Sequence, residues 1–218
     1  MGKHGLNDAQ VQRFASTLRD AAANAAPVPM LSLKAAVSER DGYRIQHAAW
    51  PDASMGYKMG LTSRAKMAQV GVDRPIYGVL AASARLDAGE EPSRAQFIHP
   101  RAEPEVAFVM RRAPAPGCGA EELLRCVEYV TIAIELIDSR YRDFKFALGD
   151  VIADNASGSR VVLGDMAVRP GKVDLSNVGM VFEVDGVPRH FASSAAILDH
   201  PLRSLLALVR LLDRFSDV

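Results

Sequence analysis

Two glutamates share one face of a predicted strand. Residues 101–110, RAEPEVAFVM, form an apolar run typical of a β-strand, and Glu103 and Glu105 stand two positions apart in it. Side chains at positions i and i+2 of a strand point to the same side, so the two carboxylates lie next to each other. A third carboxylate, Glu135, stands in a second apolar run, AIELID. If they were buried and unpaired, these carboxylates would each cost several kcal/mol.

A hard divalent cation would remove that cost. Magnesium and manganese ions prefer carboxylate oxygens in octahedral geometry, and they leave positions open for water or substrate. The alternative is structural: one or two of the acids face solvent on an edge strand, or they pair with Arg101, Arg111 or Arg140. The spacing alone does not decide between a metal site and this structural interpretation.

A third segment is rich in short polar side chains. Residues 138–164, DSRYRDFKFALGDVIADNASGSRVVLG, lie between predicted strands. Loops on a rigid scaffold often present functional groups, so this density is typical of a lined pocket. A turn-rich surface loop is the alternative. The polar residues of this segment include Asp138, Arg140, Lys145, Asp150, Asp154, Asn155 and Ser157.

Helices are predicted at both ends of the chain and strands between them, which indicates an α+β fold. Asn7 or Asp8 can cap a first helix that runs to about Asn24, and a second helix is predicted over about 34–48. Asp185-Gly186 separates two alternating runs and predicts a hairpin over 179–191. Further elements are predicted as strands at 57–61 and 128–138 and as helices at 63–70, at 120–127 and over the last 20 residues.

The composition excludes several classes of protein. The chain has 218 residues, of which 49% are hydrophobic, and its 26 basic side chains balance 26 acidic ones. This balance argues against nucleic acid or an anionic membrane as a partner. No apolar run approaches the roughly 18 residues of a membrane span, and the start of the chain does not read as a signal peptide. Cys118 and Cys126 lack zinc-type spacing, so a cytoplasmic protein is predicted.

Three segments resemble the fumarylacetoacetate hydrolase superfamily: GYKMGLTSRAKMAQVGVDRPIYGVL (56–80), IHPRAEPEVAFVM (98–110) and AIELIDSRYRDFKFALGDVIADNASGSRVVLG (133–164). Within it they look like the branch of 2-keto-4-pentenoate hydratases and 4-oxalocrotonate decarboxylases, and DSRYRDFKF is closest to the decarboxylases. The resemblance runs from about residue 6 to 212. It implies a mixed β-roll with flanking helices that assembles into a homo-oligomer. A helical N-terminal region, residues 1–50, would precede a β-rich catalytic core, residues 51–218.

The resemblance also implies a set of site residues. A magnesium or manganese ion would be held by Glu103, Glu105 and Glu135. Lys58 of YKMG would lie in the pocket, with Asp73 of GVDRP near it. Each has a structural alternative, since Lys58 could extend from its strand to solvent and Asp73 could only shape a turn. The further candidates that the same match implies are Lys145, which could instead be a surface charge, and Asp154, Asn155 and Ser157.

The implied activity is metal-dependent decarboxylation of 2-oxo-3-hexenedioate (4-oxalocrotonate) to 2-hydroxypenta-2,4-dienoate, in the meta-cleavage catabolism of aromatic compounds. The alternative is hydration of a 2-keto-4-pentenoate, which would use the same chelation of a 2-oxo acid. The family's final strands have no counterpart after DRFSDV, so a C-terminally truncated chain is also expected. Such a chain could be a non-catalytic partner subunit in a complex with the pathway hydratase.

Overall fold

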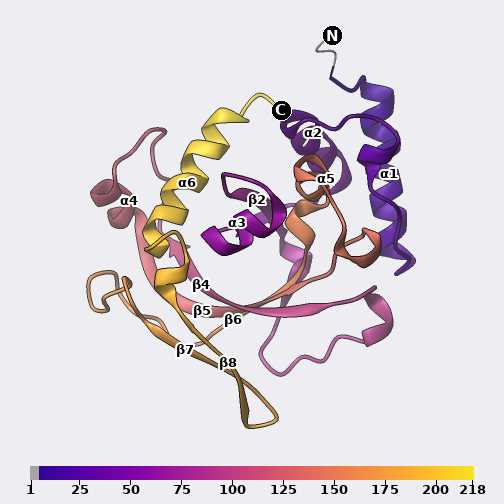
Figure 1. Ribbon diagram of the computed structural model, residues 1–218. Helices are drawn as coiled ribbons and strands as arrows, with labels where there is room; N and C mark the ends of the chain where they lie inside the picture. The colour runs from indigo at the N-terminus through magenta and orange to yellow at the C-terminus, as the bar shows by residue number, and fades with distance from the viewer. Residues whose placement is uncertain (1–4) are drawn as a thin grey trace.

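The computed structural model describes residues 5–218 (Figure 1). Its first helix, α1 (Asp8–Ala23), is capped by Asn7, whose side chain accepts a hydrogen bond from the Gln10 amide at 2.9 Å. The second helix, α2 (Glu39–Ala49), begins later than predicted, because Ser38 caps it and Leu31–Leu33 form a separate 3-10 turn, η1. The cap of α1 agrees with the sequence prediction. The cap of α2 places the start of that helix more than one turn later than predicted.

A four-stranded mixed sheet forms the floor of the molecule, with strand order β3-β6-β5-β4. β4 (Arg101–Met110) pairs antiparallel with β5 (Val127–Ile137), which pairs antiparallel with β6 (Gly158–Leu163). The short β3 (Arg85–Leu86) runs parallel to β6. The helix α4 (Ala120–Cys126) joins β4 to β5, and α5 (Leu148–Ala153) lies between β5 and β6. β4 is therefore an edge strand.

A second, two-stranded sheet lies over one face of this floor. β1 (Ser54–Gly60) pairs antiparallel with β2 (Ile76–Ala81), and α3 (Arg64–Val70) connects them. Ser63 caps α3, and Gly71 ends it in the left-handed conformation with φ 76°. Figure 1 shows α3 and β2 above the sheet of β4, β5 and β6, with α6 (Pro201–Arg214) beside them. One face of the floor is thereby covered.

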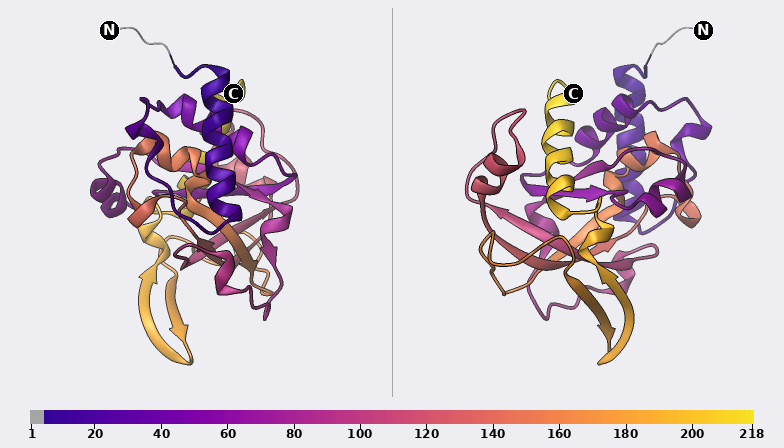
Figure 2. Two further views of the ribbon diagram at one scale, coloured as in Figure 1. Left: turned by 90° about the vertical axis from the view of Figure 1, so that its right-hand side faces the viewer. Right: turned by 60° about the vertical axis from the view of Figure 1, so that its left-hand side comes forward.

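The hairpin of β7 (Gly179–Val184) and β8 (Val187–Ser193) projects away from the helices (Figure 2). Its turn residues Asp185 and Gly186 have φ of 54° and 71°, as a type I′ turn requires. The Asp-Gly prediction of a hairpin is therefore confirmed. Together these elements confirm the α+β class.

The two faces of β5 differ in burial. Thr131, Ala133 and Glu135 are buried on the covered face, whereas Ile132 and Ile134 are 62% and 43% exposed on the other. The N-terminal helices share a core with the later chain, since Phe14 and Leu18 pack in one cluster with Tyr141. The division of the chain at residue 50 stays a prediction. Within the described range, no helix has the length and hydropathy of a membrane span.

Candidate metal centre

The strand register brings the three glutamates together. β4 and β5 are paired so that Glu103 lies directly opposite Glu135, and Glu105 lies opposite Ala133. Because side chains alternate along both strands, all three carboxylates point to the covered face of the sheet. One oxygen from each of the three lies within 4.8 Å of the others. Glu135 is buried, and the two glutamates of the edge strand are partly buried.

Lys58 reaches the cluster from β1. Its Nζ lies 3.0 Å from Glu135 Oε2 and donates a hydrogen bond of 2.9 Å to the carbonyl of Ala156. Burial is the largest single influence and lowers the pKa of Lys58, but the charges of Glu135, Glu103 and Glu105 together raise it above its ordinary value. The side chain is therefore a charged ammonium group, and it does not extend to solvent.

One ammonium does not neutralise three carboxylates. Burial raises the pKa of Glu105 to about 7 despite the opposing charge of Lys58, and the charges of Glu135 and Glu103 add to the increase. Burial also raises the pKa of Glu135, although Lys58 opposes it. Glu135 Oε1 is buried and has no hydrogen-bond partner among the described residues. An all-oxygen donor set with excess negative charge and an unsatisfied oxygen fits a hard divalent cation.

The predicted alternative pairing with arginine is not what the structure shows. Arg111 pairs with Glu128 at 3.1 Å, and Arg140 pairs with Asp154. In the part of the chain that is described, no arginine lies within ion-pair distance of the three glutamates. Within the described residues, Lys58 is the cation that pairs directly with this cluster, and the more distant charge of Arg140 also opposes the rise in the pKa of Glu135.

A left-handed turn forms the wall beside Lys58. Asn155, Ala156 and Ser157 form a 3-10 turn, η5, in which all three have positive φ, at 56°, 49° and 59°. Each such residue costs roughly 1–2 kcal/mol when it is not glycine, so the surrounding contacts must hold the turn. Its Ala156 carbonyl is the acceptor for Lys58. The turn thus sets the position of the ammonium group.

A buried ion pair anchors this turn. Arg140 pairs with Asp154, which directly precedes the turn, and both side chains are almost fully buried. The Ser139 hydroxyl donates to the Asp154 carboxylate at 3.1 Å, and the Ser157 hydroxyl donates to it at 3.3 Å. Arg140 also donates to the backbone carbonyls of Asp154, Asp138 and Gly158. Burial raises the pKa of Asp154 although Arg140 opposes it.

The turn is also tied to β2. The side chain of Asn155 accepts from the Val79 amide at 2.7 Å and donates to the Val79 carbonyl at 2.8 Å. A Cβ atom on Gly78 would lie 2.5 Å from the Asn155 carbonyl oxygen, so glycine is required at this close approach. A Cβ atom on Gly158 would meet Glu135 Oε1 and the Lys58 side chain at 3.3 Å.

The structure brings together seven of the nine predicted site residues. Lys58 and the three glutamates form the cluster, and Asp154, Asn155 and Ser157 form the wall beside it. Asp73 and Lys145 lie elsewhere: their side chains are 80% and 76% exposed, and they pair with Arg74 and Asp143. Arg140 was predicted only as a polar residue of the 138–164 segment and as a possible partner of the glutamates, and its pairing with Asp154 was not predicted. Its partner lies 14 residues away in an irregular segment, and no local pattern indicates such a pair.

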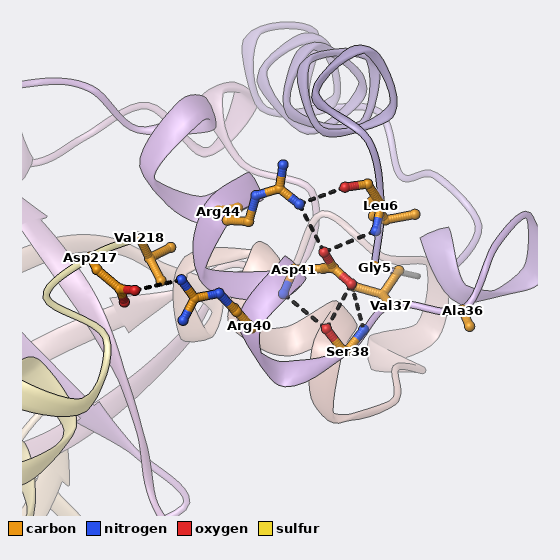
Figure 3. A pocket seen from close by; sticks show the side chains of 10 residues that line it. All are labelled: Gly5, Leu6, Ala36, Val37, Ser38, Arg40, Asp41, Arg44, Asp217 and Val218. Atoms are coloured by element: carbon orange, nitrogen blue, oxygen red, sulfur yellow. Dashed lines mark hydrogen bonds and ion pairs between the residues drawn. The ribbon is translucent and has the colours of Figure 1, made fainter. Parts of the chain in front are cut away.

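One large cavity lies apart from the cluster. It has a volume of about 870 Å³ and is lined by Leu6, Asp41, Arg44 and Asp217 among others (Figure 3). Its charged groups satisfy one another, since Arg44 donates to Asp41 at 3.1 Å and Arg40 to Asp217 at 2.8 Å. A smaller cavity of about 170 Å³ is lined in part by Arg140, Asn155 and Gly158, so it adjoins the turn. The chemistry of the carboxylate cluster, rather than cavity size, locates the candidate site.

The fold and the cluster define an α+β protein with a candidate divalent-cation site of three carboxylates. No family model matches the chain. It is 43% identical over 208 residues to 4-oxalocrotonate decarboxylase of Pseudomonas sp, a match that covers 93% of this chain and 80% of that protein. It is 34% identical over 196 residues to 2-hydroxypent-2,4-dienoate hydratase of Pseudomonas putida, covering 86% of this chain and 88% of the hydratase.

A solved structure is also similar to this chain. The structure of 4-oxalocrotonate decarboxylase from Pseudomonas putida G7, complexed with magnesium and adipate, superposes with a TM-score of 0.91 at 34% identity. The match covers 97% of this chain and 84% of that one. The chain belongs to the family of the 4-oxalocrotonate decarboxylases and 2-keto-4-pentenoate hydratases. The resemblance found in the sequence is confirmed.

Proposed function

We propose that the protein decarboxylates 2-oxo-3-hexenedioate to 2-hydroxypenta-2,4-dienoate and carbon dioxide, in the meta-cleavage catabolism of aromatic compounds. The observation that carries the proposal is the convergence of Glu103, Glu105 and Glu135 in a chain 43% identical to a decarboxylase. These carboxylates would hold a magnesium or manganese ion, as the similar structure contains magnesium. When bound, the ion supplies a Lewis acid beside the 2-oxo acid end of the substrate.

Lys58 is the group that we propose for proton delivery. Loss of the C6 carboxylate as carbon dioxide leaves an electron pair at C5, which the C3–C4 double bond conjugates to the C2 oxygen. Protonation of that oxygen gives the dienol product. Lys58 is a buried ammonium group beside the carboxylate cluster, so it can stabilise the developing oxyanion and donate the proton.

We assign Asp154, Asn155 and Ser157 a positioning role. The Asp154 carboxylate bonds to Arg140, Ser139 and Ser157, and the Asn155 side chain bonds to the backbone of β2. These contacts hold the turn that presents the Ala156 carbonyl to Lys58. Catalytic roles for Asp73 and Lys145 stay predictions, since neither contacts the cluster. A homo-oligomer, a complex with the pathway hydratase and a cytoplasmic location also remain predictions.

A direct assay tests the proposed reaction. Purified protein with magnesium is mixed with 2-oxo-3-hexenedioate, and carbon dioxide release is measured with and without a chelator. We expect release that the chelator abolishes and that magnesium restores. Release that continues in the chelator would contradict the proposal.

Hydration is the second candidate, because the chain is 34% identical to a hydratase. The same preparation is given 2-hydroxypenta-2,4-dienoate, and its disappearance is followed. Hydration of this dienoate without carbon dioxide release from the diacid would identify a hydratase. Inertness toward both substrates, together with stable association with a hydratase, would identify a non-catalytic partner subunit.

A further inference from the structure

Arg101 is a cation at the start of β4, the strand that carries Glu103 and Glu105. It begins β4, two residues before Glu103, so strand alternation places its side chain on the same face as Glu103 and Glu105. In the register it lies opposite Ile137, just beyond the pair of Glu103 and Glu135. Its side chain is exposed, and across residues 5–218 no carboxylate lies within ion-pair distance of it. Its positive charge is therefore available to a ligand.

An aromatic ring fixes the guanidinium. Arg101 Cζ lies 3.9 Å from the centroid of the Phe144 ring, and the ring of His99 packs on Phe144 with centroids 4.5 Å apart. Phe144 and the preceding Asp143 have positive φ, at 54° and 58°, which is unusual for a bulky residue. Stacking covers a flat face of the guanidinium and leaves the N–H groups at its edge free. That edge has the geometry to bind a carboxylate through two hydrogen bonds.

The spacing along β4 matches the length of the substrate. Two strand residues span about 6.6 Å, which separates the backbone of Arg101 from that of Glu103. A six-carbon diacid has five carbon–carbon bonds of about 1.5 Å each, so its terminal carboxyl carbons lie roughly 6 Å apart in an extended chain. A substrate whose 2-oxo acid end lies at the glutamates can therefore reach Arg101 with its second carboxylate.

We propose that Arg101, held by Phe144, binds the second carboxylate of the substrate and selects 2-oxo diacids over 2-oxo monoacids. The inference rests on the proposed function, because only a diacid has this second carboxylate. That carboxylate is the group lost as carbon dioxide, so its charge disappears during the step. Arg101 thus contributes to substrate binding, and it does not stabilise the transition state.

A matched pair of ligands tests the proposal. 2-Oxoadipate and 2-oxohexanoate share the 2-oxo acid end and chain length, and they differ only in the second carboxylate. Their dissociation constants are measured by calorimetry on the magnesium-loaded protein. We expect the protein to bind 2-oxoadipate about tenfold more tightly, and we expect Arg101→Gln to bind both ligands equally. In turnover, Arg101→Gln should raise KM for 2-oxo-3-hexenedioate without lowering kcat.

Arg142→Gln is the matched control, because Arg142 is an exposed arginine two residues from Phe144. It should keep the preference for the diacid. Equal weakening of both ligands by Arg101→Gln, or loss of the preference in Arg142→Gln instead, would overturn the proposal. The outcomes also separate the two claims. The protein could prefer 2-oxoadipate through Arg101 and yet release no carbon dioxide from 2-oxo-3-hexenedioate. That result would refute the proposed decarboxylation and support Arg101 as the binding site of the second carboxylate.

Discussion

At the scale of single residues, one buried ammonium group faces three carboxylates. Lys58 pairs with Glu135, while Glu105 keeps a pKa of about 7 because burial outweighs the attraction of Lys58. Part of the repulsion is therefore unrelieved in the metal-free protein. Substitutions in this cluster should separate metal binding from stability.

Glu105→Gln removes one charge and preserves the shape of the side chain. We expect magnesium-dependent turnover to be lost and magnesium affinity, measured by calorimetry, to fall at least about tenfold. The thermal midpoint of the metal-free variant should be unchanged or raised, because burying a charged carboxylate is unfavourable. Glu128→Gln, in the exposed pair with Arg111, is the control and should bind magnesium normally. Retained magnesium-dependent turnover in Glu105→Gln would contradict the ligand assignment.

Lys58→Met leaves Glu135 buried without its cation. Breaking a buried pair on one side costs about 3–5 kcal/mol, and urea denaturation of the metal-free protein should show a loss of that size. The double variant Lys58→Met/Glu135→Gln should recover part of it, since the uncompensated charge is then removed. A single variant as stable as the parent protein would show that the pair does not matter for folding.

At the scale of elements, the turn of residues 155–157 connects β2 to Lys58 through close backbone contact. Gly78→Ala would place its Cβ 2.5 Å from the Asn155 carbonyl oxygen, so the turn must move. We expect the free energy of unfolding to fall by about 1–3 kcal/mol. We also expect kcat to fall by a larger factor than that by which KM changes. Gly56→Ala is the control, because its Cβ would meet nothing within 4 Å. Equal effects of the two substitutions would contradict this account.

Asp154→Asn tests the anchor of the same turn. It leaves the Arg140 charge buried without its carboxylate partner, and we expect a destabilisation of about 3–5 kcal/mol in urea denaturation. Glu121→Gln removes a carboxylate from the exposed pair with Arg125 and should change stability by less than about 1 kcal/mol. If the two variants lose similar stability, the buried pair is not an anchor.

The sequence predicted the elements whose signals are local. The apolar runs of β4 and β5, the cap at Asn7 and the Asp185-Gly186 turn all lie where they were expected. The left-handed turn could not be predicted, because three consecutive non-glycine residues with positive φ have no sequence signature. The pair of Arg140 and Asp154 was missed for a related reason, since tertiary packing alone brings these side chains together.

At the scale of the whole molecule, the projecting hairpin exposes apolar side chains. Val181 and Phe191 lie opposite each other in the register of β7 and β8, and Phe191 is 75% exposed. Exposed apolar surface of this kind is typical of contact between protein chains. In the predicted homo-oligomer, a second copy of the chain would bury this apolar surface of the hairpin.

Phe191→Glu tests that role of the hairpin. We expect the parent protein to sediment as a multimer in analytical ultracentrifugation and the variant to sediment with lower mass. His190→Glu is the control, because His190 lies on the opposite face of β8 and is also exposed. If Phe191→Glu keeps the mass of the parent, the hairpin does not hold the assembly together.

The left-handed turn also limits which amino acids can occupy its three positions. Glycine, asparagine and aspartate adopt positive φ most readily, whereas proline is locked near −65° and β-branched side chains are strongly disfavoured there. In a saturation library selected for folded protein, positions 155–157 should therefore retain small or Asx residues and lose proline, valine and isoleucine. Few amino acids would then be tolerated at these three positions, although they lie in neither an α-helix nor a strand. The restriction would reflect the backbone geometry that positions Lys58.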